Sequence, residues 1–131
     1  MNVPHILVVD DDDPVRNLFD RILSEVGYRV TAVSRARVAL LKIRENHYDA
    51  MVMDLSMPDM DGFELLRQAR SDCPYLKILV TSGFMSGNLP GMASRFGADA
   101  TLDKILAPQL LFPVVCRMLD CWDNDGVCDS V

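Results

Sequence analysis

The sequence predicts an α/β fold in which a single doubly wound domain has a five-stranded parallel sheet with helices on both faces. Short apolar runs alternate five times with segments of helical periodicity, a pattern typical of parallel strands joined through helices. The length of 131 residues fits one domain that can bury a sizeable core without disulfides or structural metal. These two observations exclude a small disulfide-stapled fold and a multidomain chain.

The predicted strands are apolar runs bounded by charged or turn-forming residues, at positions 6–9, 29–33, 50–53, 78–81 and 100–102. The predicted helices occupy residues 14–26, 35–46, 62–70, 90–96 and 108–119. Asp13 before Pro14 predicts the N-cap of the first helix, and Ser34 that of the second. Gly27 and Gly97 are expected to end helices.

Composition limits the classes of partner. Hydrophobic residues make up 50% of the chain, charged residues 24%, and the net charge is −6. This acidity argues against direct nucleic-acid binding. The four cysteines lack the paired spacing and nearby histidines of a zinc or redox site, so we interpret them as free thiols.

The N-terminus has no basic segment before its short apolar run, and no stretch has the length of a membrane span. We therefore expect a cytoplasmic protein without membrane contact.

Residues 1–120 are predicted to form the domain. Residues 121–131 are acidic and lack basic residues, which predicts a disordered tail.

Polar side chains follow the predicted strands at their carboxyl ends, where open parallel sheets bind ligands. They are Asp10, Asp11, Asp54, Thr81, Ser82 and Lys104. Three neighbouring carboxylates repel one another unless a cation joins them. Oxygen ligands without histidine or cysteine favour Mg²⁺.

With magnesium bound, Asp54 can act as a nucleophile toward phosphorus and form an acyl phosphate. Lys104, together with the hydroxyl of Ser82 or Thr81, would then stabilise the phosphoryl oxygens. Asp13 is better explained as a helix-start residue than as a metal ligand.

The motifs Ile-Leu-Val-Val-Asp-Asp-Asp at residues 6–12, Asp-Leu-Ser-Met-Pro-Asp-Met-Asp-Gly at 54–62, Ile-Leu-Val-Thr-Ser-Gly at 78–83 and Gly-Ala-Asp-Ala-Thr-Leu-Asp-Lys at 97–104 occur in this order. In order and spacing the chain resembles the receiver domains of two-component response regulators and hybrid histidine kinases. The resemblance covers nearly all of the chain and implies a flavodoxin-like (βα)5 fold. It also implies a signalling module rather than a conventional enzyme, one that catalyses at most its own phosphorylation and dephosphorylation.

Position by position, the resemblance implies that Asp54 accepts a phosphoryl group from a histidine kinase or a histidine phosphotransfer protein. Asp10, Asp11, Asp54 and the backbone carbonyl of Ser56 would hold magnesium. Lys104 would contact the phosphoryl group, and the switch hydroxyl falls on Ser82 rather than Thr81.

The chain departs from the usual receiver pattern at two positions. Ile105 replaces the proline that usually follows the lysine, which predicts a trans peptide or a reshaped loop. Thr101 replaces the usual aromatic switch residue, so we expect phosphorylation to be read through residues 90–96 and the loops after Ser82 and Lys104.

Leu110, Pro113 and Val114 fall outside the predicted sheet-facing stripe of the last helix. Their exposure would suit a homodimer contact through residues 90–96, 100–102 and 108–119. Two alternatives to a phospho-acceptor stay open. One is a degenerate receiver used for protein contacts only, and the other is a magnesium-dependent aspartyl phosphohydrolase.

Overall fold

The computed structural model describes residues 3–120 and confirms the predicted fold class. The strands are β1 (His5–Val9), β2 (Arg29–Val33), β3 (Ala50–Asp54), β4 (Lys77–Ser82) and β5 (Ala100–Asp103). The helices are α1 (Asp13–Glu25), α2 (Ala36–Glu45), α3 (Gly62–Asp72), α4 (Leu89–Arg95) and α5 (Ala107–Asp120), with a 3-10 turn, η1 (Lys104–Leu106), before α5. The predicted tail, residues 121–131, lies outside the described part of the chain.

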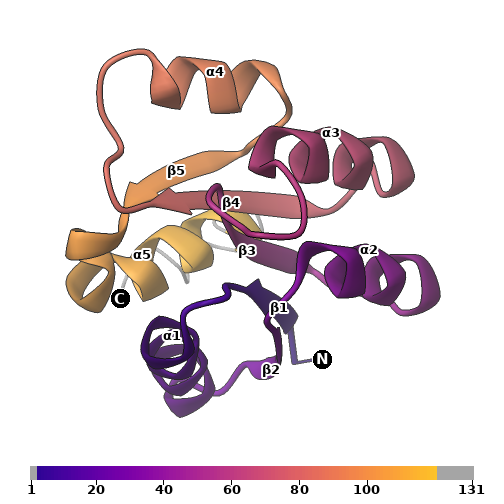
Figure 1. Ribbon diagram of the computed structural model, residues 1–131. Helices are drawn as coiled ribbons and strands as arrows, with labels where there is room; N and C mark the ends of the chain where they lie inside the picture. Colours follow the sequence, from indigo (N-terminus) through magenta and orange to yellow (C-terminus); the bar gives the residue numbers. More distant parts are fainter. Residues whose placement is uncertain (1–2, 121–131) are drawn as a thin grey trace.

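The five strands are parallel in the order β2-β1-β3-β4-β5 (Figure 1). Helices α1 and α5 cover one face of the sheet, and α2, α3 and α4 cover the other. Strand order reverses between β1 and β3. A parallel α/β sheet binds its ligand at such a point, beyond the carboxyl ends of the strands.

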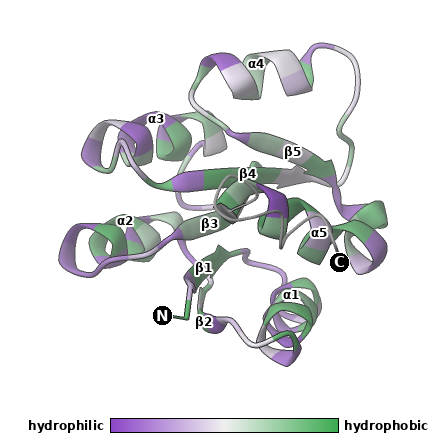
Figure 2. Cartoon of the chain, turned by 180° about the vertical axis from the view of Figure 1, so that it is seen from behind, coloured by the Kyte–Doolittle hydropathy of each residue, from purple (hydrophilic) through white to green (hydrophobic). Residues whose placement is uncertain are grey.

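Apolar side chains alternate between the two faces of the sheet. In β1, Leu7 and Val9 pack against α2 and α3, whereas Ile6 and Val8 pack toward α1 and α5. Because both faces are buried, β1, β3 and β4 are green along most of their length in Figure 2. The near-continuous apolar runs in the sequence have this cause.

The predicted cap of α1 was wrong by one residue. Asp12, not Asp13, is the N-cap, and its Oδ1 accepts the backbone N–H of Val15 at 3.2 Å. Asp13 is the first helical residue, where its negative charge suits the positive end of the helix dipole.

The prediction that Ser34 caps α2 was also wrong. The N-cap is Arg35, and its side chain makes no capping bond. Instead, the carboxylate of Asp59, from the β3–α3 loop, accepts the backbone N–H groups of Ala36 and Arg37, both at 3.0 Å. A cap from 23 residues away cannot be read from the local sequence.

The turn glycines behave as predicted, since Gly27 and Gly97 have φ of 105° and 116° directly after α1 and α4. The prediction for α5 was correct for Leu110 and Pro113, which are exposed, but wrong for Val114, which is half-buried against the core. Within residues 3–120, no helix combines the length and apolar character needed to cross a membrane.

Candidate functional site

Strand register brings the acidic residues together. Val9 pairs with Met53, so Asp10, the residue after β1, lies beside Asp54, the last residue of β3. Asp10 and Asp54 are only 1% and 3% exposed, whereas Asp11 is exposed. Buried carboxylates require compensating charge or hydrogen bonds, so this edge of the sheet is a candidate functional site.

The three carboxylates form a possible cation site. Asp10, Asp11 and Asp54 each offer one oxygen, and these oxygens lie within 4.8 Å of one another. The Oδ1 atom of Asp10 accepts the N–H of Asp12 at 2.9 Å, whereas its buried Oδ2 receives no hydrogen bond from the backbone. A donor set made only of oxygens fits a hard divalent ion such as Mg²⁺.

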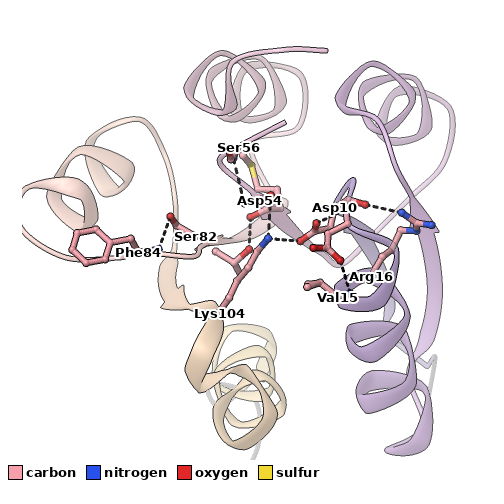
Figure 3. A network of polar contacts seen from close by, with 11 residues as sticks. Asp10, Val15, Arg16, Asp54, Ser56, Ser82, Phe84 and Lys104 are labelled. Atoms are coloured by element: carbon pink, nitrogen blue, oxygen red, sulfur yellow. Dashed lines mark hydrogen bonds and ion pairs between the residues drawn. The ribbon is translucent and has the colours of Figure 1, made fainter. Parts of the chain in front are cut away.

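Lys104 supplies positive charge at the same place. Its Nζ lies 2.8 Å from Asp10 Oδ2 and 3.1 Å from Asp54 Oδ2 (Figure 3). Burial pushes the pKa of Lys104 downward, but the two carboxylates outweigh burial and raise it above its usual value. The lysine therefore stays charged beside Asp54.

Burial is the largest influence on Asp54 and raises the pKa of its carboxyl group. Lys104 opposes this effect, as does the backbone N–H of Ser56, which donates to Asp54 Oδ1 at 3.2 Å. Negative charge on Asp54 is thus costly in the metal-free protein. A divalent cation would remove much of this cost.

The two candidate hydroxyl groups have different surroundings. Thr81 is fully buried, and its Oγ1 donates to the backbone oxygen of Met53 at 3.1 Å. Ser82 is half-buried, and its Oγ accepts the N–H of Phe84 at 3.2 Å (Figure 3). Thr81 hydrogen-bonds within the sheet, whereas Ser82 is the last residue of β4 and adjoins the β4–α4 loop.

Sequence reasoning missed Arg16. One guanidinium nitrogen, Nη1, donates to the backbone oxygen of Asp10 at 2.9 Å, and the other, Nη2, donates to Asp13 Oδ1 at 2.6 Å. The side chain thereby braces the β1–α1 loop that presents the acidic residues. The i,i+3 spacing from Asp13 was a signal for the ion pair but not for the contact with Asp10.

The residues of this site lie within a segment that matches a known protein family. The family model described as the response regulator receiver domain matches residues 6–115. The chain belongs to this family. It is a two-component receiver domain, a signalling module and not a conventional enzyme.

Relatives of this receiver domain occur within longer proteins. The response regulator MprA of Mycolicibacterium vanbaalenii is 42% identical over 115 residues, which are 86% of this chain and 48% of MprA. The sensory/regulatory protein RpfC of Xanthomonas campestris pv. campestris is 34% identical over 111 residues, 81% of this chain and 15% of RpfC. The receiver domain therefore spans about half of one relative and a small part of the other.

Solved structures share its fold. A CheY-like receiver domain from Methanospirillum hungatei superposes with a TM-score of 0.85 at 31% identity, covering 91% of this chain and 95% of that one. The response regulator TrrA of Thermotoga maritima, solved in complex with Mg²⁺ and BeF, gives a TM-score of 0.81 at 28% identity, covering 89% of this chain and all (100%) of that one.

The role of Lys104 in the metal-free receiver domain can be tested through the acidity of Asp54. Lys104→Met keeps an unbranched side chain of similar length but removes the positive charge that lowers the pKa of Asp54. The pKa of Asp54 is therefore expected to rise further. Carboxyl-carbon NMR titration measures it. Lys77→Met, at the opposite end of the sheet, is the control and should leave Asp54 unchanged. A fall in the pKa of Asp54 in Lys104→Met would contradict this electrostatic role.

Proposed function

We propose that this receiver domain accepts a phosphoryl group on Asp54 from a phosphohistidine donor, in a magnesium-dependent step, and then changes the face it offers to partners. The donor would be a sensor histidine kinase or a histidine phosphotransfer protein. The observation that supports this most is the buried Asp54 carboxylate, which is paired with Lys104 and clusters with the carboxylates of Asp10 and Asp11.

Transfer of the phosphoryl group would be a single displacement at phosphorus. An oxygen of Asp54 forms a bond to phosphorus while the bond from phosphorus to the donor's imidazole nitrogen breaks, and that nitrogen keeps the electron pair. Lys104, whose Nζ lies 3.1 Å from Asp54 Oδ2, would stabilise the phosphoryl oxygens. The hydroxyl of Ser82 would take part after the β4–α4 loop moves toward the phosphoryl group.

Asp10, Asp11, Asp54 and the carbonyl oxygen of Ser56 are the proposed magnesium ligands. Their oxygen donors suit Mg²⁺, and the related TrrA was solved with Mg²⁺ and BeF. When bound, the ion would offset the negative charge of the carboxylates and of the incoming phosphoryl group.

The metal ligands can be separated from their neighbours by substitution. Asp10→Asn and Asp11→Asn are each expected to weaken Mg²⁺ binding on the order of tenfold or more, because each removes a charged oxygen ligand. Calorimetric titration measures the affinity. Asp13→Asn is the control, since Asp13 pairs with Arg16 at 2.6 Å outside the cluster. Equal losses in all three variants would contradict the assignment of ligands.

Intact-mass measurement tests the proposed function directly. Incubation with a small-molecule phosphodonor and Mg²⁺ should add one phosphoryl group, and chelation of the metal should prevent it. A chain that gains no mass under these conditions would instead be a degenerate receiver. Turnover of free phosphomonoesters without a phosphorylated protein would favour the phosphohydrolase alternative.

The proposed output surface comprises α4, β5 and α5. Thr101 in β5 provides no aromatic ring, so the phosphorylated state would be read through α4 and its adjoining loops. Leu110 is 40% exposed on α5 and suits a contact with a second copy of the chain. The half-buried Val114 contributes less to this surface than its sequence position indicated.

A further inference from the structure

The carboxylate of Asp103 joins two loops at the edge of the site. Asp103 is the last residue of β5, and its Oδ2 accepts the backbone N–H of Met85 at 3.1 Å. Its Oδ1 accepts the backbone N–H of Ile105, also at 3.1 Å, and so caps η1. One side chain thereby bridges the β4–α4 loop and the turn that leads into α5.

Each of these segments adjoins a residue of the proposed phosphoryl site. Ser82 is paired with Asp103 in the register of β4 and β5, and the β4–α4 loop starts after it. Lys104 follows Asp103 and is the first residue of η1, while its Nζ reaches Asp10 and Asp54. Asp103 is thus adjacent to both residues: Ser82 is its partner on the neighbouring strand, and Lys104 is the next residue in the chain.

We propose that Asp103 is a positioning residue for phosphoryl transfer, because its carboxylate clamps together the loops that carry Ser82 and Lys104. This inference rests on the proposed phospho-acceptor function. In the clamped arrangement the ammonium group is held beside Asp54 before the donor arrives, which reduces the ordering required during the reaction.

The η1 arm of the clamp depends on the backbone N–H of Ile105. A proline at this position has a fixed φ and no N–H to donate. Ile105 supplies the N–H group, but its side chain is 78% exposed, so packing does little to hold the turn. The Asp103 cap therefore provides the restraint that a proline ring would otherwise provide.

The second arm of the clamp, the hydrogen bond from Met85 N–H to Asp103, restrains the β4–α4 loop. In the β4–α4 loop, Phe84 is 76% exposed, and Gly83 and Gly87 lie in open surroundings. Two hydrogen bonds to side chains hold this loop, one from Phe84 N–H to Ser82 and one from Met85 N–H to Asp103. When Ser82 turns toward a phosphoryl group, the hydrogen bond to Asp103 and the packing of the Met85 side chain against the core continue to hold the loop.

The test measures binding of Mg²⁺ with beryllofluoride and the rate of phosphorylation by a small phosphodonor. Asp103→Ala is expected to lower both by roughly tenfold, since only part of the free energy of the two lost hydrogen bonds goes into holding Ser82 and Lys104 in place. Asp103→Asn keeps one acceptor oxygen and should show a smaller loss. Amide exchange at Met85 should rise in Asp103→Ala.

A matched control is Asp99→Ala, just before the opposite end of β5. Asp99 also holds backbone, since its Oδ2 accepts the N–H of Ile78 at 2.8 Å and contacts Arg70 at 2.8 Å. Its removal should lower the free energy of unfolding without changing beryllofluoride affinity or phosphorylation rate. Equal functional losses in Asp99→Ala and Asp103→Ala would make the effect one of general stability and would overturn the proposal.

Ile105→Pro separates the two arms. It removes the N–H donor of η1 but leaves the contact with Met85, so Asp103→Ala should cost less in the Ile105→Pro background than in the wild type. Identical costs in both backgrounds would contradict the clamp. If the wild type is phosphorylated and Asp103→Ala equals it, this inference alone fails; if the wild type gains no phosphoryl group, the proposed function fails.

Discussion

Asp54→Asn is expected to gain no phosphoryl group under conditions that label the wild type fully. Asparagine has nearly the same shape, and its side-chain oxygen can still accept the N–H of Ser56. It lacks the anionic oxygen that must attack phosphorus. Intact-mass spectrometry after incubation with a small phosphodonor and Mg²⁺ measures the outcome.

Unfolding is not expected to explain this loss. Burial raises the pKa of Asp54, so the folded protein holds a proton on this group more tightly than the unfolded chain does. Ionised Asp54 therefore lowers stability above its folded pKa, and this penalty is relieved as the pH falls through that value. A neutral asparagine avoids the penalty, so Asp54→Asn should be at least as resistant to denaturant as the metal-free wild type.

Asp20→Asn serves as the control for labelling. Asp20 lies on α1, where its Oδ1 accepts the hydroxyl of Ser24 at 2.8 Å, away from the carboxylate cluster. This variant should be labelled as the wild type is. Phosphoryl mass on Asp54→Asn equal to that of the wild type would show that another residue is the acceptor.

Among alanine replacements of the glycines in residues 3–120, Gly62→Ala is expected to cause the largest loss of stability. A Cβ atom at Gly62 would overlap the backbone oxygen of Leu55 and lie 2.6 Å from its Cα. Both obstacles are backbone atoms, so no side-chain rotation relieves the overlap. We expect the free energy of unfolding to fall by about 3 kcal/mol or more, measured by urea denaturation.

The position of Gly62 links stability to the site. Leu55 lies between Asp54 and Ser56, and its N–H donates to Thr81 at 3.0 Å. Displacing Leu55 would shift Asp54, so variants that remain folded should also lose affinity for Mg²⁺. Gly91→Ala is the control, since nothing lies within 4 Å of its added Cβ and it lies within α4. It should raise stability by up to about 1 kcal/mol. A loss below about 1 kcal/mol in Gly62→Ala would contradict the close contact.

The fold could be predicted from the sequence because its signals are local and repeated. Alternation of apolar strands with helices specifies a parallel sheet, and glycine after α1 and α4 marks where each helix ends. The same alternation places Asp54 and Lys104 at the same edge of the sheet. Asp10 could be placed beside them because residues that follow parallel strands meet there.

Contacts between distant loops could not be predicted in this way. Ser34 has the chemistry of a helix cap, yet Asp59 from another loop caps α2. Val114 falls outside the helical stripe, yet it packs partly against the core. Periodicity describes one helix at a time, whereas these contacts depend on how neighbouring elements are placed.

The sequence alone determined which residues reach the carboxyl edge of the sheet, because strand position and the two-residue alternation of side chains are local properties. Only the tertiary structure decided how those residues are held: Lys104 between Asp10 and Asp54, Arg16 on the carbonyl of Asp10, and Asp103 between Met85 and Ile105. The physical reason is that a hydrogen bond forms only within about 3.5 Å and an ion pair within about 4 Å, and packing of the whole domain sets such distances.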